Sequence, residues 1–214
     1  RNAQYIFLIV VDAMRADHLG CYGYARETSP NIDALAAEGL VFDNAFSQAS
    51  YTDTSIASLF TALYPKSHKM RRSADWLSEY SLIGRFQDAG FATGGFSANV
   101  LINPDDHFDR GFSHFEVAPY ARADIVFGQA VRWLERRRND WNKIFVYIHL
   151  IDPHDLYFAP IPYTDMYDKG YPARHTAFRL RRNMENAFGQ ACEADANCCY
   201  DPYFENLSDK DRLL

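Results

Sequence analysis

Asp12 is the first residue whose type and position suggest chemistry. It directly follows residues 5–11, a continuous run of β-branched and aromatic side chains. A carboxylate beside a buried run is unfavourable unless it is paired or binds a metal ion. Two interpretations stay open on position alone: Asp12 is a metal ligand, or it caps a helix over residues 13–17, which needs only a hydrogen bond.

Thr52 opens a second candidate segment, in which several hydroxyl groups precede a predicted helix. The positive end of a helix favours an anion nearby. A hydroxyl held there against a divalent cation loses its proton more readily and can attack phosphorus or sulfur. The alternative is that Thr52, Asp53, Thr54 or Ser55 is simply the N-cap, and the local sequence by itself favours that alternative.

A third group lies at the end of another apolar run, residues 143–151. His149 is within this run, and Asp152 and His154 directly follow it. A histidine can coordinate a metal, hold an anionic oxygen or protonate a leaving group. A histidine on a strand is equally a hydrogen-bonded core residue. Two histidines and a carboxylate at one strand end favour a functional site.

The elements that must position these residues alternate between strands and helices. We predict strands over residues 5–11, 40–44, 91–96 and 143–151, and helices over residues 30–37, 55–63, 77–89, 121–138 and 174–191. Strands separated by helices require crossover connections, so we expect an α/β fold with a mainly parallel central sheet flanked by helices on both faces. Residues 5–11 are typical of a strand that is buried on both faces. Ligands gather outside the carboxyl ends of such strands, where all three groups fall.

The composition narrows the classes of function. With 214 residues, 48% of them hydrophobic and 23% charged, the chain suffices for one domain with a buried core. A net charge of −6 argues against a nucleic-acid partner. Basic clusters at residues 66–72 and 136–138 are interpreted as a solvated loop and a helix end. No apolar run approaches the roughly 20 residues of a membrane helix, although an upstream anchor stays possible.

The four cysteines bear on the compartment. Cys192 pairs with Cys198 or Cys199 if the protein is exported; otherwise these thiols are free. Zinc is disfavoured because no histidine lies at ligand spacing within that stretch. Cys21 is interpreted as a buried small residue. A periplasmic or extracellular location is favoured over a cytoplasmic one.

Five segments, taken in order, resemble the sulfatase family of the alkaline phosphatase superfamily. They are IVVDAMRADHLGCYGY (9–24), TSPNIDALAAEG with VFDNAFSQA (28–39 and 41–49), ASLFTALYPKSH (57–68), FDRGFSHF (108–115) and HLIDPH (149–154). Each motif alone is weak, but five in order across residues 4–165 are specific. The resemblance implies that residues 1–214 are the N-terminal portion of a single sulfatase-like α/β catalytic domain whose C-terminal part is missing.

The resemblance also implies roles for individual residues. Asp12 matches an aspartate that binds a divalent cation, with calcium favoured and magnesium, manganese or zinc as alternatives. Thr52 falls at the position of the nucleophile, which also contacts the metal. His154 matches a histidine that contacts the substrate anion or assists the leaving group. Weaker matches on the substrate side or behind the site are His149, Lys66 and His68.

This chain departs from the family pattern in ways that alter the expected chemistry. Formylglycine maturation needs Cys (or Ser)-x-Pro-Ser-Arg, whereas residues 52–56 read Thr-Asp-Thr-Ser-Ile. A formylglycine mechanism is therefore disfavoured, and a threonine nucleophile resembles the phosphodiesterases and phosphoethanolamine transferases of the superfamily. Ala13 replaces a frequent second aspartate, and no Ser-Asp-His-Gly-like motif supplies further metal ligands.

These observations leave two main hypotheses. The first is a metal-dependent hydrolase or transferase of sulfate or phosphate esters, acting on a small-molecule, glycan or lipid ester. The second is a non-catalytic protein with the sulfatase fold that binds an anionic glycan or a lipid headgroup. An unrelated α/β binding protein is least favoured.

Overall fold

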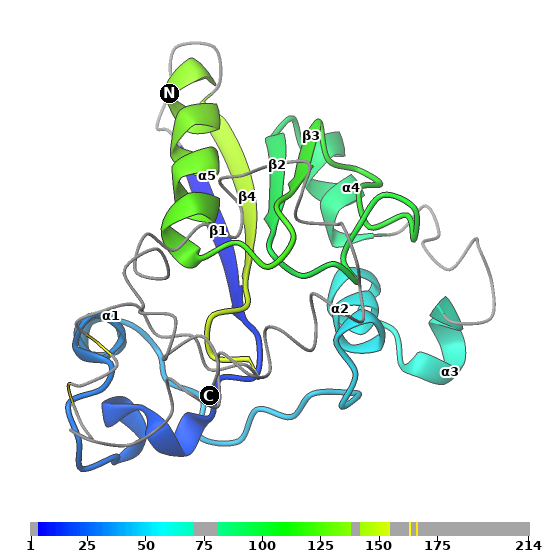
Figure 1. Cartoon of the computed structure of the whole chain (residues 1–214). Helices are drawn as coiled ribbons and strands as arrows, with labels where there is room; N and C mark the ends of the chain where they lie inside the picture. The colour runs from blue at the N-terminus through cyan, green and yellow to red at the C-terminus, as the bar shows by residue number, and fades with distance from the viewer. Residues whose placement is uncertain (1–3, 71–80, 138–141, 155–162, 164–165, 167–214) are drawn as a thin grey trace, which may run out of the picture.

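A parallel sheet forms the centre of the structure, a computed structural model that describes residues 4–70, 81–137, 142–154, 163 and 166. Its four strands lie in the order β1-β4-β2-β3 (Figure 1). Their bounds are Gln4–Val11 for β1, Ala92–Ser97 for β2, His114–Val117 for β3 and Lys143–Leu150 for β4. Because every pairing is parallel, all the carboxyl ends meet at one edge of the sheet.

Helices cover both faces of this sheet. Their bounds are Pro30–Glu38 for α1, Thr52–Thr61 for α2, Pro65–His68 for α3, Leu82–Asp88 for α4 and Ala123–Arg137 for α5. Helix α5 packs on β2 and β4 from one side, while α2 and α4 lie on the other (Figure 1). Helix α1 and two short 3-10 turns, Ala16–His18 and Gly20–Tyr22, gather beyond the end of β1. The predicted α/β fold with helices on both faces is therefore confirmed.

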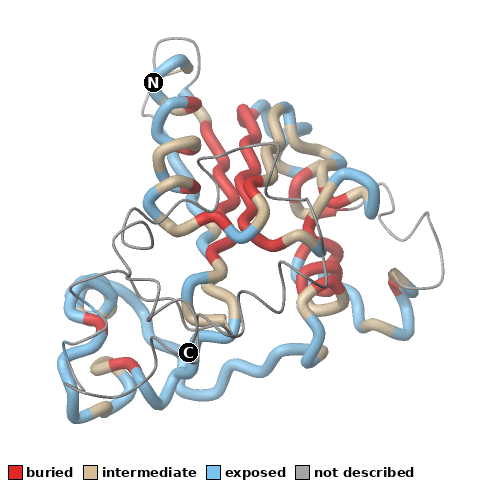
Figure 2. Tube along the Cα trace, in the orientation of Figure 1, coloured by how far each residue is buried: buried red, intermediate tan, exposed pale blue. Residues whose placement is uncertain are grey.

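Strand β4 divides its side chains between two hydrophobic clusters. Ile144, Val146 and Ile148 face α5 and pack with its Trp133. Tyr147, on the opposite face, packs with side chains of α2 and α4. Successive strand residues point to opposite faces, so His149 shares the α2 face with Tyr147. Figure 2 shows the resulting buried centre at β4 and β2.

Two glycines let β2 lie close to its neighbours. Every residue of β2 is buried. A Cβ atom at Gly94 would lie 3.0 Å from the Trp133 ring, and one at Gly95 would overlap the ring of Phe115. Residues larger than glycine would therefore push α5 or β3 away from the sheet.

Several predicted boundaries were wrong. The predicted strand over residues 40–44 is not a strand: Leu40 is 89% exposed and the segment makes no ladder. Apolar composition alone does not form a strand without a hydrogen-bonding neighbour. The short strand β3 was missed. Helix α2 begins at Thr52 rather than Ser55, and Ala62 ends it in the left-handed conformation.

Strand β1 is less buried than predicted. It pairs with β4 on one side only, and within the described residues it is an edge strand. Tyr5 is 52% exposed and Phe7 is 50% exposed, so β1 is not buried on both faces by the described residues. The predicted helix over 174–191 and the cysteines at 192, 198 and 199 lie outside the described residues.

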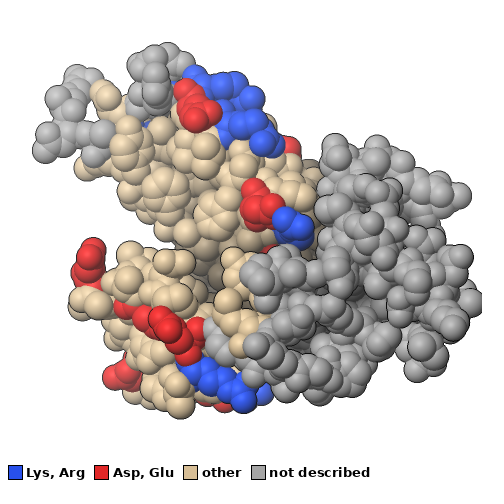
Figure 3. All heavy atoms as spheres, turned by 60° about the vertical axis from the view of Figure 1, so that its left-hand side comes forward, with Lys and Arg blue, Asp and Glu red and all other residues tan. Residues whose placement is uncertain are grey.

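Charged side chains are spread over the surface in small groups. On the face drawn in Figure 3, basic and acidic atoms lie next to one another in small groups, and uncharged residues separate these groups. Arg136 and Arg137 lie in the last turn of α5, as the helix-end interpretation predicted. No helix among the described residues is long and apolar enough to cross a membrane.

Candidate active site

The parallel register brings three polar residues from three strand ends together. The backbone N–H of Asp12, just after β1, donates to the carbonyl of Leu150 in β4 over 2.9 Å. The N–H of Ala98, just after β2, donates to the carbonyl of His149, also over 2.9 Å. Asn99 follows at once. Asp12, His149 and Asn99 therefore meet at the carboxyl edge of the sheet.

The contacts that the Asp12 carboxylate makes with described residues converge on one oxygen, Oδ2. Asn99 Nδ2 donates to Asp12 Oδ2 over 2.6 Å, and Thr52 Oγ1 donates to the same atom over 3.1 Å. His149 Nε2 lies 3.6 Å from it. Arg15, not Asp12, occupies the N-cap position of the first 3-10 turn. The capping interpretation of Asp12 is therefore wrong.

These neighbours favour the ionised form of Asp12. The interaction with the His149 ring lowers the pKa of Asp12 most, burial opposes this, and the hydrogen bonds from Asn99 and Thr52 lower it further, to about 2. The side chain is only 15% exposed. A partly buried carboxylate that keeps its charge is suited to bind a cation.

Asn99 is a site residue that the sequence analysis missed. Its side chain is buried, and its Oδ1 accepts a hydrogen bond from the N–H of Leu101 over 2.9 Å. The hydroxyl of Ser97 donates to the Asn99 carbonyl and accepts from the Asn99 N–H. The rule that drew attention to Asp12, a polar residue just past a buried strand, applies equally to Asn99.

Thr52 is the first residue of α2. Tyr51 occupies the N-cap position, and no side chain caps the helix there. The Thr52 hydroxyl instead donates to Asp12, forty residues earlier in the chain. Asp53 accepts hydrogen bonds from the N–H and hydroxyl of Thr54. The interpretation of Thr52 as a simple N-cap is therefore not what the structure shows.

The third predicted group separates into different surroundings. His149 is fully buried, and its Nδ1 lies 2.7 Å from the hydroxyl of Tyr147. Asp152 Oδ1 accepts from the N–H of Ala123, the first residue of α5, over 3.2 Å. His154 is half-buried in the turn after β4, where its N–H donates to the Ile151 carbonyl. Asp152 therefore binds the first turn of α5, whereas His154 lies at the carboxyl edge of the sheet.

Lys66 and His68 lie on α3 with different exposures. Lys66 is exposed. His68 is 4% exposed, its Nε2 lies 3.0 Å from the hydroxyl of Ser58, and its Nδ1 accepts from the N–H of Met70. Burial lowers the pKa of His68. His68 therefore ties α3 to α2, whereas Lys66 is available to solvent.

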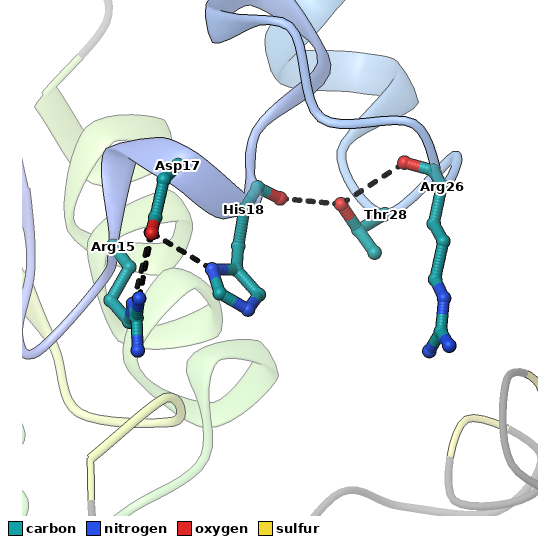
Figure 4. A network of polar contacts seen from close by, with 5 residues as sticks. All are labelled: Arg15, Asp17, His18, Arg26 and Thr28. Carbon is teal, nitrogen blue, oxygen red and sulfur yellow. Dashed lines mark hydrogen bonds and ion pairs between the residues drawn. The ribbon is translucent and has the colours of Figure 1, made fainter.

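Exposed polar contacts hold the loop that follows Asp12. Arg15 pairs with Asp17 in two hydrogen bonds of 2.9 and 2.6 Å, and His18 Nδ1 lies 2.9 Å from the same carboxylate (Figure 4). The hydroxyl of Thr28 donates to the His18 carbonyl. The neighbouring Cys21 is a partly exposed free thiol rather than a buried residue.

The donor atoms suit a hard divalent cation only in part. Asp12 and Thr52 present oxygen atoms close together, the ligand type that calcium and magnesium prefer. Such ions want about six oxygen ligands. Among the residues that the structure describes, no group of three or more His, Cys, Asp or Glu side chains could hold a metal. The two oxygen donors of Asp12 and Thr52 are fewer than such an ion prefers.

A family model named Sulfatase matches residues 4–212. The chain belongs to the sulfatase family. Its relatives include an arylsulfatase of Clostridium perfringens, 37% identical over 91 residues, and human iduronate 2-sulfatase, 41% identical over 127 residues. These matches cover 41% and 56% of this chain. They span only 19% and 22% of the two relatives.

Solved structures share the fold of this sulfatase-family chain. The C-terminal periplasmic domain of EcEptC from Escherichia coli superposes with a TM-score of 0.60 at 19% identity, covering 83% of this chain and 53% of that one. The putative sulfatase yidJ from Bacteroides fragilis gives 0.62 at 16% identity, covering 79% and 48%. The chain thus spans about half of each structure, and the alkaline phosphatase superfamily fold predicted from the sequence is confirmed.

Proposed function

We propose that this chain carries the nucleophile side of the active site of a metal-dependent hydrolase or transferase of sulfuric or phosphoric esters. The observation that supports this most is the 3.1 Å contact between Thr52 Oγ1 and Asp12 Oδ2. It joins a hydroxyl at the start of a ten-residue helix to an ionised carboxylate at the end of β1. A nucleophile beside a cation ligand is an arrangement suited to metal-assisted ester cleavage.

In the proposed reaction, Thr52 Oγ loses its proton to solvent and attacks phosphorus or sulfur, and a new oxygen–phosphorus or oxygen–sulfur bond forms. The ester bond to the substrate alcohol breaks, and the alcohol oxygen leaves with the bonding electrons and takes a proton from His154. Water or an acceptor alcohol then gives its proton to His154 and attacks the same centre. The bond to Thr52 Oγ breaks, and the threonine oxygen leaves and takes a proton from solvent. The backbone N–H groups in the first turn of α2 are proposed to donate hydrogen bonds to the anionic oxygens of the transferred group.

Asp12 and Thr52 are the residues proposed to hold the cation. Calcium is favoured, and magnesium, manganese and zinc are alternatives, since the donors are oxygens. A bound divalent cation lowers the pKa of the threonine hydroxyl and neutralises charge on the transferred group. One solved relative of the fold, EcEptC, is described as a complex with Zn.

The identity of residue 52 favours phosphorus over sulfur. Threonine cannot be converted to formylglycine, which the family's sulfate-ester chemistry uses. Phosphoethanolamine transferase EptC from Campylobacter jejuni has this fold, with a TM-score of 0.53 at 17% identity. A threonine that takes the phosphoryl group covalently is consistent with either hydrolysis or transfer to a second alcohol.

The substrate class and compartment are proposed from relatives of the fold. One solved structure contains k-i-k-neocarrahexaose and another D-glucosamine-2-N,6-O-disulfate. Others are periplasmic domains. We therefore favour a glycan or lipid ester, or a small molecule of similar chemistry, and a periplasmic or extracellular location. The chain is proposed to be the N-terminal portion of a larger catalytic domain, because half of each solved structure lies outside the match.

The decisive experiment compares Thr52→Ala with Thr54→Val in the intact protein. The Thr54 hydroxyl donates to Asp53 rather than Asp12, so it is a matched control. A panel of aryl phosphate diesters, monoesters and sulfates is assayed with added divalent metal. We expect Thr52→Ala to abolish turnover and the covalent adduct detected by mass spectrometry, while Thr54→Val retains both. Turnover unchanged in Thr52→Ala would refute the nucleophile assignment.

A non-catalytic binding function is the second candidate. The observation that favours it is the incomplete ligand set, since the described residues include no group of three acidic, histidine or cysteine side chains suited to a metal. In that case, an anionic glycan or lipid headgroup would bind saturably and no ester would be cleaved. Calorimetric titration alongside the turnover assay separates the two functions.

A further inference from the structure

Asn99 is held in the site by burial and by several hydrogen bonds. Its side chain is 4% exposed. Its Oδ1 accepts a hydrogen bond from the Leu101 N–H. Its backbone N–H donates to the Ser97 hydroxyl, which in turn donates to the Asn99 carbonyl. Because Oδ1 is occupied by a donor, the amide NH₂ group must face the other way, toward Asp12. The hydrogen bond to Asp12, at 2.6 Å, is shorter than the 3.1 Å bond from Thr52 to the same carboxylate.

The two oxygens of Asp12 have different surroundings. Oδ2 receives Asn99 Nδ2 and Thr52 Oγ1, and His149 Nε2 approaches to 3.6 Å. Within the described part of the chain, Oδ1 receives no hydrogen bond. A carboxylate oxygen has about two lone-pair directions, so Oδ2 has little capacity left for a further partner. The carboxylate is held by one oxygen and presents the other.

We propose that Asn99 is a positioning residue, which fixes the Asp12 carboxylate through Oδ2 so that Oδ1 binds the divalent cation. The inference rests on the proposed function, since it assigns Asp12 as a ligand. Partners that orient a metal ligand commonly change metal affinity by 10- to 100-fold when they are removed. Asn99 acts through Asp12 and does not itself need to touch the ion.

The test separates the role of Asn99 in its turn from its role toward Asp12. In Asn99→Ser, the hydroxyl can still accept from the backbone N–H two residues on, but it is too short to reach Asp12. Asn103→Ala is the matched control: the Asn103 amide donates within the same loop, to the Val100 carbonyl and to Asp106, and makes no contact with Asp12. Binding of Mn²⁺ alone to the metal-free protein is followed by electron paramagnetic resonance, and folding by thermal unfolding.

We expect Asn99→Ser to raise the Kd for Mn²⁺ by at least about tenfold, and Asn103→Ala to change it by less than about twofold. Wild-type affinity in a folded Asn99→Ser protein would overturn the inference and leave the proposed function standing. Absence of Mn²⁺ binding by the wild-type protein would overturn both.

If Asn99→Ser does not fold, a second measurement tests the hydrogen bond from Asn99 to Asp12 on which the proposal depends. In wild-type protein with ¹⁵N-labelled asparagine, the Asn99 side-chain amide protons should resonate downfield because they bond to a carboxylate. Asp12→Asn should shift that resonance and leave the side-chain amide resonance of Asn103 unchanged. An Asn99 resonance that does not respond to Asp12→Asn would contradict the proposed contact.

Discussion

The hydroxyl of Tyr147 lies 2.7 Å from Nδ1 of His149, and both side chains are fully buried on the same face of β4. Burial, and then the negative charge of Asp12, raise the pKa of Tyr147 well above its usual value. The hydroxyl therefore keeps its proton and can donate a hydrogen bond to Nδ1. The Asp12 carboxylate lies 3.6 Å from Nε2 and favours a ring proton on that nitrogen, which leaves Nδ1 as the acceptor for the hydroxyl. Tyr147 thus sets the orientation of the group behind the candidate cation ligand.

Tyr147→Phe should change the tautomer of His149 without disturbing the core. The phenylalanine ring keeps the edge contact with Phe60, whose centroid is 5.0 Å from that of Tyr147. The lost donor leaves Nδ1 buried without its partner, which costs about 1–3 kcal/mol of stability. We expect ¹⁵N spectra of the imidazole to show a mixture of tautomers in place of one, and the unfolding midpoint to fall.

Tyr22→Phe is the control for this substitution. The Tyr22 hydroxyl donates to the Phe42 carbonyl at the surface, so its loss should change stability by less than about 0.5 kcal/mol. A single unchanged His149 tautomer in Tyr147→Phe would show that the hydroxyl does not direct the ring.

Asp12 should make the stability of the protein depend on pH in the acid range. Its pKa is about 2 in the folded protein against 3.8 for the ordinary group, because of His149 first and then Asn99 and Thr52. A lowered folded pKa means that the unfolded chain binds the proton more tightly. The stabilisation is therefore complete above pH 3.8 and is lost as the pH falls toward 2, and it amounts to roughly 2 kcal/mol.

Denaturant unfolding of the wild-type protein and Asp12→Asn between pH 2 and 5 checks this dependence. We expect the difference in free energy of unfolding between the two proteins to shrink as the pH falls through this range. Asp17→Asn is the control, since Asp17 forms an exposed pair with Arg15 that solvent screens. A difference that stays constant with pH would mean that Asp12 is not held in its charged form.

Most of the sheet could be predicted from the sequence, because buried parallel strands are continuous apolar runs. The runs over 5–11, 91–96 and 143–151 correspond to β1, β2 and β4 to within one residue at every boundary. Strand β3 has only four residues, and its histidine and glutamate interrupt the continuous apolar run by which the other strands were predicted. The apolar stretch at 40–44 misled because pairing, which composition does not encode, decides whether a strand forms.

The sequence predicted Asp12 and Thr52 as candidate site residues, but it did not predict the contact between their side chains. Asp12 was predicted from its position after a strand, and Thr52 was predicted from the family resemblance. That these two side chains touch depends on how α2 packs against the sheet. Asn99 was missed because its importance comes from the order β1-β4-β2, in which a strand late in the sequence separates β1 from β2. Only the topology brings residues 12 and 99 within hydrogen-bonding distance.

Lys66 and His68 were both predicted on the substrate side, and their surroundings predict different behaviour. Lys66 is exposed on α3, so Lys66→Ala should leave stability within about 0.5 kcal/mol of wild type. If it attracts an anionic ester, its loss raises KM and leaves kcat unchanged. Steady-state kinetics at low ionic strength, where charge attraction is least screened, provides the measurement.

His68→Gln should show the opposite pattern. His68 is buried against Ser58, so its loss should cost about 1–3 kcal/mol and leave KM unchanged. Burial lowers its pKa in the folded state, so its contribution to stability is present above the ordinary histidine pKa of about 6.5 and declines as the pH falls below that value. Unfolding measurements from pH 8 to 5 should therefore show a weaker pH dependence in His68→Gln than in wild type. A raised KM in His68→Gln with unchanged stability would instead place His68 at the substrate.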